Sequence, residues 1–155
     1  AEYMRELLRK PYVIYDYMYS NGVRKEDLPR LSKNGFVESS VWAKASIACA
    51  KNEREKGALI FRYQCMSCHT ESGYRGIKKL IAERDQDAVV GFLKMMKETE
   101  RDKNPYLGIM PPLVCNDEEI QALSKYLASI GGKNNDKIGL RSSRLKLSMK
   151  PDEAQ

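Results

Sequence analysis

No run of about 18 consecutive apolar residues occurs in this 155-residue sequence, so no segment is expected to span a bilayer as a helix. Cysteine is scarce as well, because four residues are far fewer than a disulfide-stapled secreted scaffold of this length would use. The sequence begins without the short apolar core of a secretory signal. We expect any such signal to have been removed or to lie outside this sequence.

A strong charge of one sign is also missing. The net charge of +6 results from 27 Lys and Arg against 21 Asp and Glu. It is spread as +2 over residues 1–50, +1 over 51–132 and +3 over 133–155. We find neither a concentrated basic stripe with aromatic residues nor a nucleic-acid-reading motif, so no nucleic acid partner is expected. Residues 133–155 are interpreted as a basic C-terminal tail.

Alternating strand patterns are absent, and helical periodicity takes their place. The sequence therefore predicts an all-α fold. Asn52 and Asp85 stand where N-caps are expected, and Asn116 with Glu119 forms the signature of a capping box. The last predicted helix ends at the glycine pair 131–132.

Residues 1–50 are predicted to form a helical N-terminal extension. The periodicity indicates two short helices, or one helix kinked at Pro11, ending at the Asn-Gly pair 21–22. A polar connector over 23–35 and a further short helix within 36–47 are predicted to follow.

The stretch QCMSCHT brings the only histidine next to two cysteines. Cys65 and Cys68 follow a helix predicted over 53–63, so both sulfurs are expected on the same side of its last turn. There they can add to the two vinyl groups of a haem, while His69 directs its imidazole at the iron. The spacing favours covalent attachment of a c-type haem.

Two other chemistries use the same pair of cysteines. A redox dithiol would need the alternation of strands and helices that this sequence does not have. A structural zinc site needs four ligands, usually as two close pairs. Cys49 and Cys115 are the candidates to complete it, but they stand singly in the sequence.

Met110 stands in the stretch GIMPP, a loop braced by glycine and proline downstream of the histidine. A thioether on a rigid loop can reach the far side of the iron as a sixth ligand, and pairing with histidine raises the reduction potential. The other interpretation of an isolated methionine is a core filler. Its place between the haem motif and the capped last helix favours the ligand.

With these motifs in this order, the chain resembles the single-haem class I cytochromes c over about residues 52–132. The resemblance implies their fold, with about three to five helices around one covalent haem. In that family the first and last helices cross closely, which would place Gly57 and Phe61 against Tyr126. The implied division of the chain is an extension over 1–50, a cytochrome c domain over 51–132 and the tail over 133–155.

The resemblance also implies roles for four residues. Cys65 and Cys68 would be the thioether links of one haem c, His69 the proximal ligand and Met110 the distal ligand. The implied function is one-electron transfer between redox protein partners, as a soluble carrier or a fixed subunit, and not an enzyme. The alternative is a haem-based sensor or binding module of small ligands in which Met110 is displaced.

Some features depart from the family pattern. Residues 70–104 contain no proline, so the usual orienting partner of His69 is not assigned. Cys49 and Cys115 are unusual, and each is predicted to be a buried, inert thiol. A Cys115 thiolate in place of Met110 would lower the potential sharply and stays open as an alternative.

The extension has a short resemblance of its own. Residues 9–13, RKPYV, and the tyrosines nearby are similar to the segment after the last membrane helix in subunit I of bd-type quinol oxidases. That likeness implies a possible membrane-bound or multi-subunit respiratory complex as partner. The alternative is that the tyrosine-rich segment only covers the cytochrome core.

Two further expectations concern the surroundings of the protein. A basic rim is expected to steer an acidic partner; its members are Lys78, Lys79, Lys94 and Lys97. Haem is attached to such motifs outside the cytoplasm, which implies a periplasm or an equivalent compartment.

Overall fold

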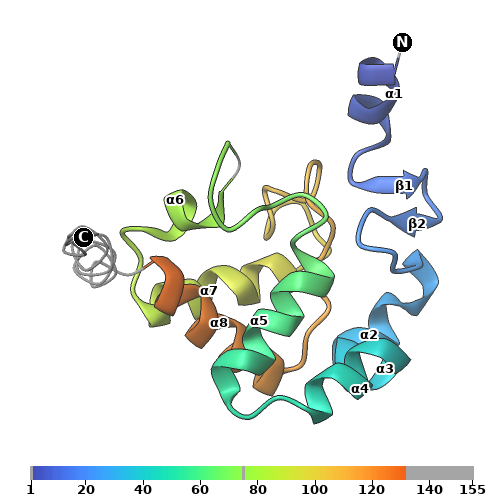
Figure 1. Cartoon of the computed structure of the whole chain (residues 1–155). Helices are drawn as coiled ribbons and strands as arrows, with labels where there is room; N and C mark the ends of the chain where they lie inside the picture. Colours follow the sequence, from blue (N-terminus) through green and yellow to red (C-terminus); the bar gives the residue numbers. More distant parts are fainter. Residues whose placement is uncertain (1, 75, 132–155) are drawn as a thin grey trace, which may run out of the picture.

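The structure, a computed structural model, describes residues 2–74 and 76–131 (Figure 1). The predicted basic tail over 133–155 lies outside these residues. The elements are, in chain order, α1 (Glu2–Arg9), β1 (Tyr12–Ile14), β2 (Met18–Tyr19), the 3₁₀ turn η1 (Lys25–Asp27), α2 (Leu28–Asn34), α3 (Phe36–Ser39), α4 (Val41–Ala48), α5 (Glu53–Gln64), α6 (Ile77–Ile81), α7 (Gln86–Lys97) and α8 (Asp117–Gly131). In the described ranges no helix is both long and apolar enough to cross a membrane.

The main core lies between α5, α7 and α8, with α6 packed against α8 (Figure 1). Its fully buried side chains include Ile60 and Phe61 of α5, Val89 of α7, and Ile120 and Leu123 of α8. The spacing of the two buried residues in α8 keeps them on one face of that helix. The predicted all-α cytochrome c fold is confirmed.

The crossing of α5 and α8 depends on Gly57. A Cβ at this position would lie 2.8 Å from Tyr126 Cβ and still closer to the carbonyl oxygen of Ala122. Phe61, one turn further on, packs against the Tyr126 ring with 5.6 Å between the ring centroids. The predicted contact of Gly57 and Phe61 with Tyr126 is therefore present.

The predicted caps are present at three helix starts. Asn52 caps α5 and Asp85 caps α7, each accepting a hydrogen bond from the backbone N–H three residues on, at 2.9 and 2.8 Å. Asn116 and Glu119 form the capping box of α8, and the hydrogen bonds in both directions measure 2.9 Å. These local signals fixed the starts of the core helices.

The predicted helix around Val13 and Tyr17 is wrong. α1 ends before Pro11, and the next residues form an antiparallel hairpin in which Tyr12 faces Tyr19. Their rings stack with 4.7 Å between centroids. Proline ends the helix and the β-branched and aromatic residues after it suit a pleated ribbon, so the hairpin replaces the second helix.

The predicted polar connector over 23–35 is wrong as well, because most of it is η1 and α2. Pro29 sits in the first turn of α2, where its missing N–H costs nothing. Leu28 and Leu31 are buried in a second apolar cluster with Tyr19 and Val23. The extension therefore packs around a second small core, which Val114 from the segment before α8 completes.

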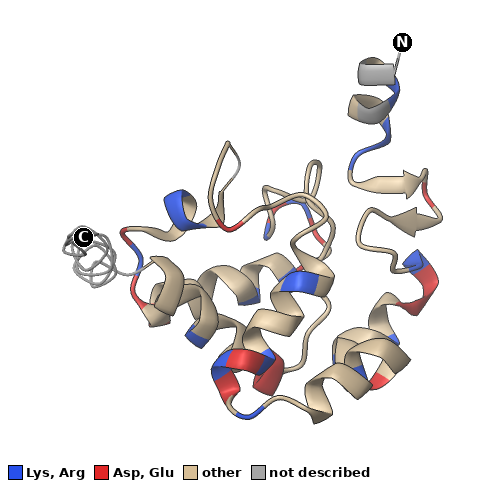
Figure 2. Ribbon diagram, in the orientation of Figure 1, with Lys and Arg blue, Asp and Glu red and all other residues tan. Residues whose placement is uncertain are grey.

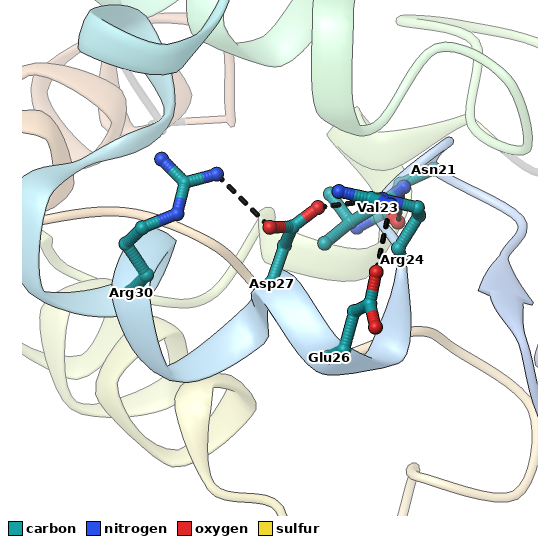
Figure 3. A network of polar contacts seen from close by, with 6 residues as sticks. All are labelled: Asn21, Val23, Arg24, Glu26, Asp27 and Arg30. Carbon is teal, nitrogen blue, oxygen red and sulfur yellow. Dashed lines mark hydrogen bonds and ion pairs between the residues drawn. The ribbon is translucent and has the colours of Figure 1, made fainter.

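Figure 3 shows how Asp27 holds the start of α2. Its carboxylate accepts hydrogen bonds from Arg24 Nε at 2.7 Å and Arg30 Nη2 at 3.0 Å. These hydrogen bonds hold the pKa of Asp27 below its usual value.

The single helix predicted within 36–47 is instead two helices, α3 and α4, separated at Ser40, whose hydroxyl caps α4.

Glu119 joins the extension to the cytochrome core. Besides its bond in the capping box, its carboxylate accepts hydrogen bonds from the backbone N–H of Phe36 at 3.0 Å and of Val37 at 2.8 Å. It thus satisfies the first turn of α3 from a helix more than 80 residues away in sequence. One buried carboxylate serves two helix starts.

Replacing Glu119 with alanine is expected to lower the free energy of unfolding by about 2–4 kcal/mol, because three backbone donors lose a charged acceptor. Glu118→Ala is the matched control, since it removes the same charge from an exposed position of the same helix. It should lower the free energy of unfolding by less than about 0.5 kcal/mol. Urea unfolding of the haem-loaded protein measures both. Equal effects of the two variants would contradict the bridging role of Glu119.

Candidate functional site

The haem motif forms the turn that closes α5. Cys65 is the C-cap residue, and its N–H donates to Phe61 O at 2.8 Å. The N–H groups of Cys68 and His69 then both donate to Cys65 O, at 3.1 and 2.8 Å. This turn brings the two cysteines and the histidine to one end of α5, as the sequence predicts.

Met110 lies at the end of a tight turn. Its N–H donates to Tyr106 O at 2.9 Å, and Pro111 and the buried Pro112 follow. After them, the N–H of Leu113 donates to Met96 O at 2.8 Å, which ties the loop to the end of α7. The backbone on both sides of Met110 is therefore fixed.

Asn104 braces the same loop from inside. It is fully buried, and its side-chain amide donates to Met96 O at 3.4 Å and Glu98 O at 3.1 Å. Its Oδ1 accepts a hydrogen bond from the N–H of Tyr106 at 3.1 Å. This role of Asn104 was not predicted from the sequence, although an asparagine directly before a proline is a turn signal.

One cavity of about 330 Å³ brings the four predicted site residues together. Cys65, Cys68 and His69 line it from the end of α5, and Met110 lines it from the loop before α8. The rest of its wall is mostly apolar, with contributions from α5, α6, α7 and α8; it includes Phe61, Ile81, Leu93, Met96 and Leu127. A volume of this size is within the range of about 300–1,000 Å³ usual for cofactor sites.

The donor set and the cavity suit a haem. Cys65 and Cys68 offer two sulfurs, and His69 and Met110 offer an imidazole nitrogen and a thioether, the axial pair of many c-type centres. A large flat ring needs an apolar enclosure, and the wall supplies it. The features together define an all-α protein built to hold a c-type haem.

The comparison with protein families agrees with this class. The family model described as Cytochrome c matches residues 54–131, half of the chain, and the chain belongs to that family. No curated protein and no solved structure matches it. The protein is thus a c-type cytochrome with covalently attached haem c, a carrier of electrons between redox proteins. Domains of this family usually work outside the cytoplasm.

The two other chemistries of the cysteines are not supported. Among residues 2–74 and 76–131, no group of three or more His, Cys, Asp or Glu is placed to hold a metal ion, so the structure does not support the zinc alternative. A thioredoxin-like dithiol would need an α/β fold, and the chain folds as an all-α cytochrome.

The two remaining cysteines differ in burial. Cys49, the C-cap residue of α4, is exposed, so its predicted burial is wrong. Cys115 is fully buried as predicted, and burial raises the pKa of its thiol well above the usual value. It does not line the cavity, and its sulfur lies 3.6 Å from Gln64 Nε2. A protonated thiol outside the cavity is a poor candidate for an iron ligand, because metal binding needs the thiolate.

Replacing Cys115 with alanine is expected to leave the visible and near-infrared spectra and the reduction potential of the protein unchanged. The lost volume should lower the free energy of unfolding by about 1–2 kcal/mol, because the thiol fills a packed site. Optical spectra and a redox titration of the variant check this. A large rise in potential, or new ligand-field bands, would show that Cys115 had been on the iron.

The lysines of the predicted basic rim do not line the cavity. Lys78 and Lys79 are on α6, and Lys94 and Lys97 are in the last turn of α7 (Figure 2). Among the described residues, the cationic side chains in the wall itself are Lys10, from the extension, and Arg84. Neither residue was predicted from the sequence to lie at the site, and no local signal marks Lys10.

Proposed function

We propose that this protein is a class I, single-haem electron carrier with one haem c bound through Cys65 and Cys68. His69 is the proximal ligand in this proposal and Met110 the distal one. The observation that carries the proposal is that all four side chains line one apolar cavity, from two segments far apart in the sequence.

The bound haem supplies one-electron chemistry, as its iron changes between the ferric and ferrous states. The chain's part would be to hold the iron with His69 and Met110, so that no substrate would reach it. The closing turn of α5 presents His69, and the proline-braced loop presents Met110. The buried side chains around them keep water out and so favour a high potential.

The sensor alternative requires Met110 to leave the iron when a small ligand arrives. Two features disfavour it: Asn104 is buried with its amide bonded to the end of α7, and Leu113 is bonded to Met96 on the other side of Met110. A loop tied at both ends does not readily move its side chain away.

For the rest of the chain we propose the division predicted from sequence, with residues 1–50 as an added unit before a cytochrome c domain over 51–132. Apolar side chains on α1 and the hairpin are exposed, among them Leu8 at 72% and Tyr15 at 71%. Such a surface is typical of an interface. With the likeness to bd-type quinol oxidases, it supports a role as an electron-transfer subunit of an extracytoplasmic respiratory complex.

Two measurements test the carrier proposal: a redox titration, and an optical spectrum of the reduced protein with carbon monoxide added. The proposal expects a single one-electron step and a reduced spectrum that carbon monoxide leaves unchanged. Carbon monoxide binding at low concentration would favour the sensor.

Fractionation tests the subunit role: a wild-type protein found wholly in the fraction without membranes or large complexes would contradict it.

A further inference from the structure

The N-terminal extension forms part of the wall of the haem cavity. Lys10 and Asn21 line it together with the cysteines, the histidine and Met110 of the family core. The family match begins at residue 54, so neither residue belongs to the matched region. The extension therefore contributes to the site itself as well as packing beside it.

The hairpin region packs against the segment that follows Met110. Asn21 Nδ2 donates to Pro112 O at 3.3 Å, two residues after Met110. Val114, fully buried, completes the apolar cluster of the extension together with Tyr19 and Val23. These contacts hold the extension against the segment that follows Met110.

Lys10 is fixed at the cavity by the same arrangement. It immediately precedes the buried Pro11, whose carbonyl oxygen accepts a hydrogen bond from the N–H of Ser20 at 2.8 Å. Tyr12, on the other side of the proline, stacks on Tyr19 in that apolar cluster. The backbone of Lys10 thus leaves a docked hairpin, and its half-buried side chain reaches the cavity wall.

Among the described residues, the charges in the wall are all of one sign. Lys10 and Arg84 line the cavity, and no described Asp or Glu does. Arg84 lies over the Phe92 ring, 4.7 Å from its centroid. Lys10 has no hydrogen bond or ion pair with any side chain that the structure describes, whereas Lys25, Lys44 and Lys56 each pair with a carboxylate. Within the part of the chain that the structure describes, the cavity therefore presents the ammonium group of Lys10 without an anion.

We propose that Lys10 of the N-terminal extension binds a carboxylate of the haem. A haem is an apolar ring that carries two propionate groups, and a carboxylate in an apolar cavity needs a cation or a donor. The ammonium of Lys10 supplies the cation. The proposal rests on the covalent haem of the family and does not require Met110 to be the distal ligand.

This role gives the extension an effect on the potential. A positive charge beside the haem, which also neutralises a propionate, favours the reduced form because that form carries one positive charge fewer. Removing the charge is therefore expected to lower the reduction potential. A lysine that only covers the surface would have a much smaller effect, because water screens its charge.

Three variants of the haem-loaded protein test the proposal. Lys10→Gln removes the charge, Lys10→Arg keeps it, and Lys33→Gln removes an exposed charge on α2 that does not line the cavity. We expect a lower reduction potential in Lys10→Gln and potentials close to wild type in the other two. The proton resonances of the haem propionate groups should shift in Lys10→Gln and stay in place in Lys33→Gln.

The outcomes separate this proposal from others. Equal potentials in Lys10→Gln and Lys33→Gln, with propionate resonances unchanged, would overturn it. So would a wild-type spectrum without a sulfur-to-iron band that gains the band in Lys10→Gln, because the lysine nitrogen would then be on the iron. Should Lys10→Gln fail to fold, a structure of the wild-type holoprotein decides: Lys10 Nζ within about 3 Å of a propionate oxygen supports the proposal, and a gap beyond hydrogen-bond reach overturns it.

Discussion

Replacing Met110 with alanine is expected to open the distal side of the iron. The reduced variant should bind about one carbon monoxide per haem, whereas the wild-type protein should bind none, because methionine no longer fills the sixth position. The oxidised variant should lose the weak near-infrared sulfur-to-iron band, and the reduction potential should fall, since the His/Met pair keeps it high. Optical spectra with and without carbon monoxide measure the first two effects, and a redox titration measures the third.

The matched control is Met96→Leu. Met96 also lines the cavity, and it is buried at the end of α7. Leucine has nearly the same volume, so this variant should keep the band and stay unreactive toward carbon monoxide. If Met96→Leu lost the band while Met110→Ala kept it, the distal ligand would be Met96 and the proposed site would be wrong.

Replacing Gly57 with alanine is expected to destabilise the protein by about 3 kcal/mol or more. Alanine is the better helix former by about 1 kcal/mol, but here its methyl group would collide with the carbonyl oxygen of Ala122 and with Tyr126. Relief would require α5 and α8 to separate, and this crossing also positions Phe61 in the cavity wall. Guanidinium unfolding of the haem-loaded variant measures the loss.

Gly91→Ala is expected to have the opposite effect and to stabilise the protein. Gly91 lies in the middle of α7, and a Cβ there would meet no atom within 4 Å. This variant should gain about 0.5–1 kcal/mol from helix propensity alone. If Gly57→Ala were also stabilising, the close approach of α5 and α8 would not be a feature of the folded protein.

Features coded in a few neighbouring residues were predictable from the sequence. The caps at Asn52, Asp85 and Asn116 placed the core helices, because each depends on a side chain and a backbone N–H three residues apart. The haem motif lies at the end of α5, since the apolar period of that helix stops there. The meeting of Met110 with His69 in one cavity was predicted from the order of the motifs along the chain and from the family resemblance, because nothing local joins two segments so far apart.

Features that depend on distant contacts were missed. Glu119 has the capping-box signature, but nothing in the sequence indicates that it also serves α3. Lys10 reaches the cavity only because the hairpin docks on Pro112 and Val114. The hairpin itself was read as helix, since its aromatic and aliphatic residues fit either period over so short a stretch. Cys49 was expected in the core, but it ends α4 on the exposed side.

The near-infrared absorption spectrum of the oxidised wild-type protein tests the central claim most directly. The account predicts a c-type visible spectrum together with a weak sulfur-to-iron band, because His69 and Met110 hold the iron of a haem attached through Cys65 and Cys68. A haem spectrum without that band would contradict Met110 as the distal ligand, and a protein purified without covalent haem from a host that attaches it would contradict the site as a whole.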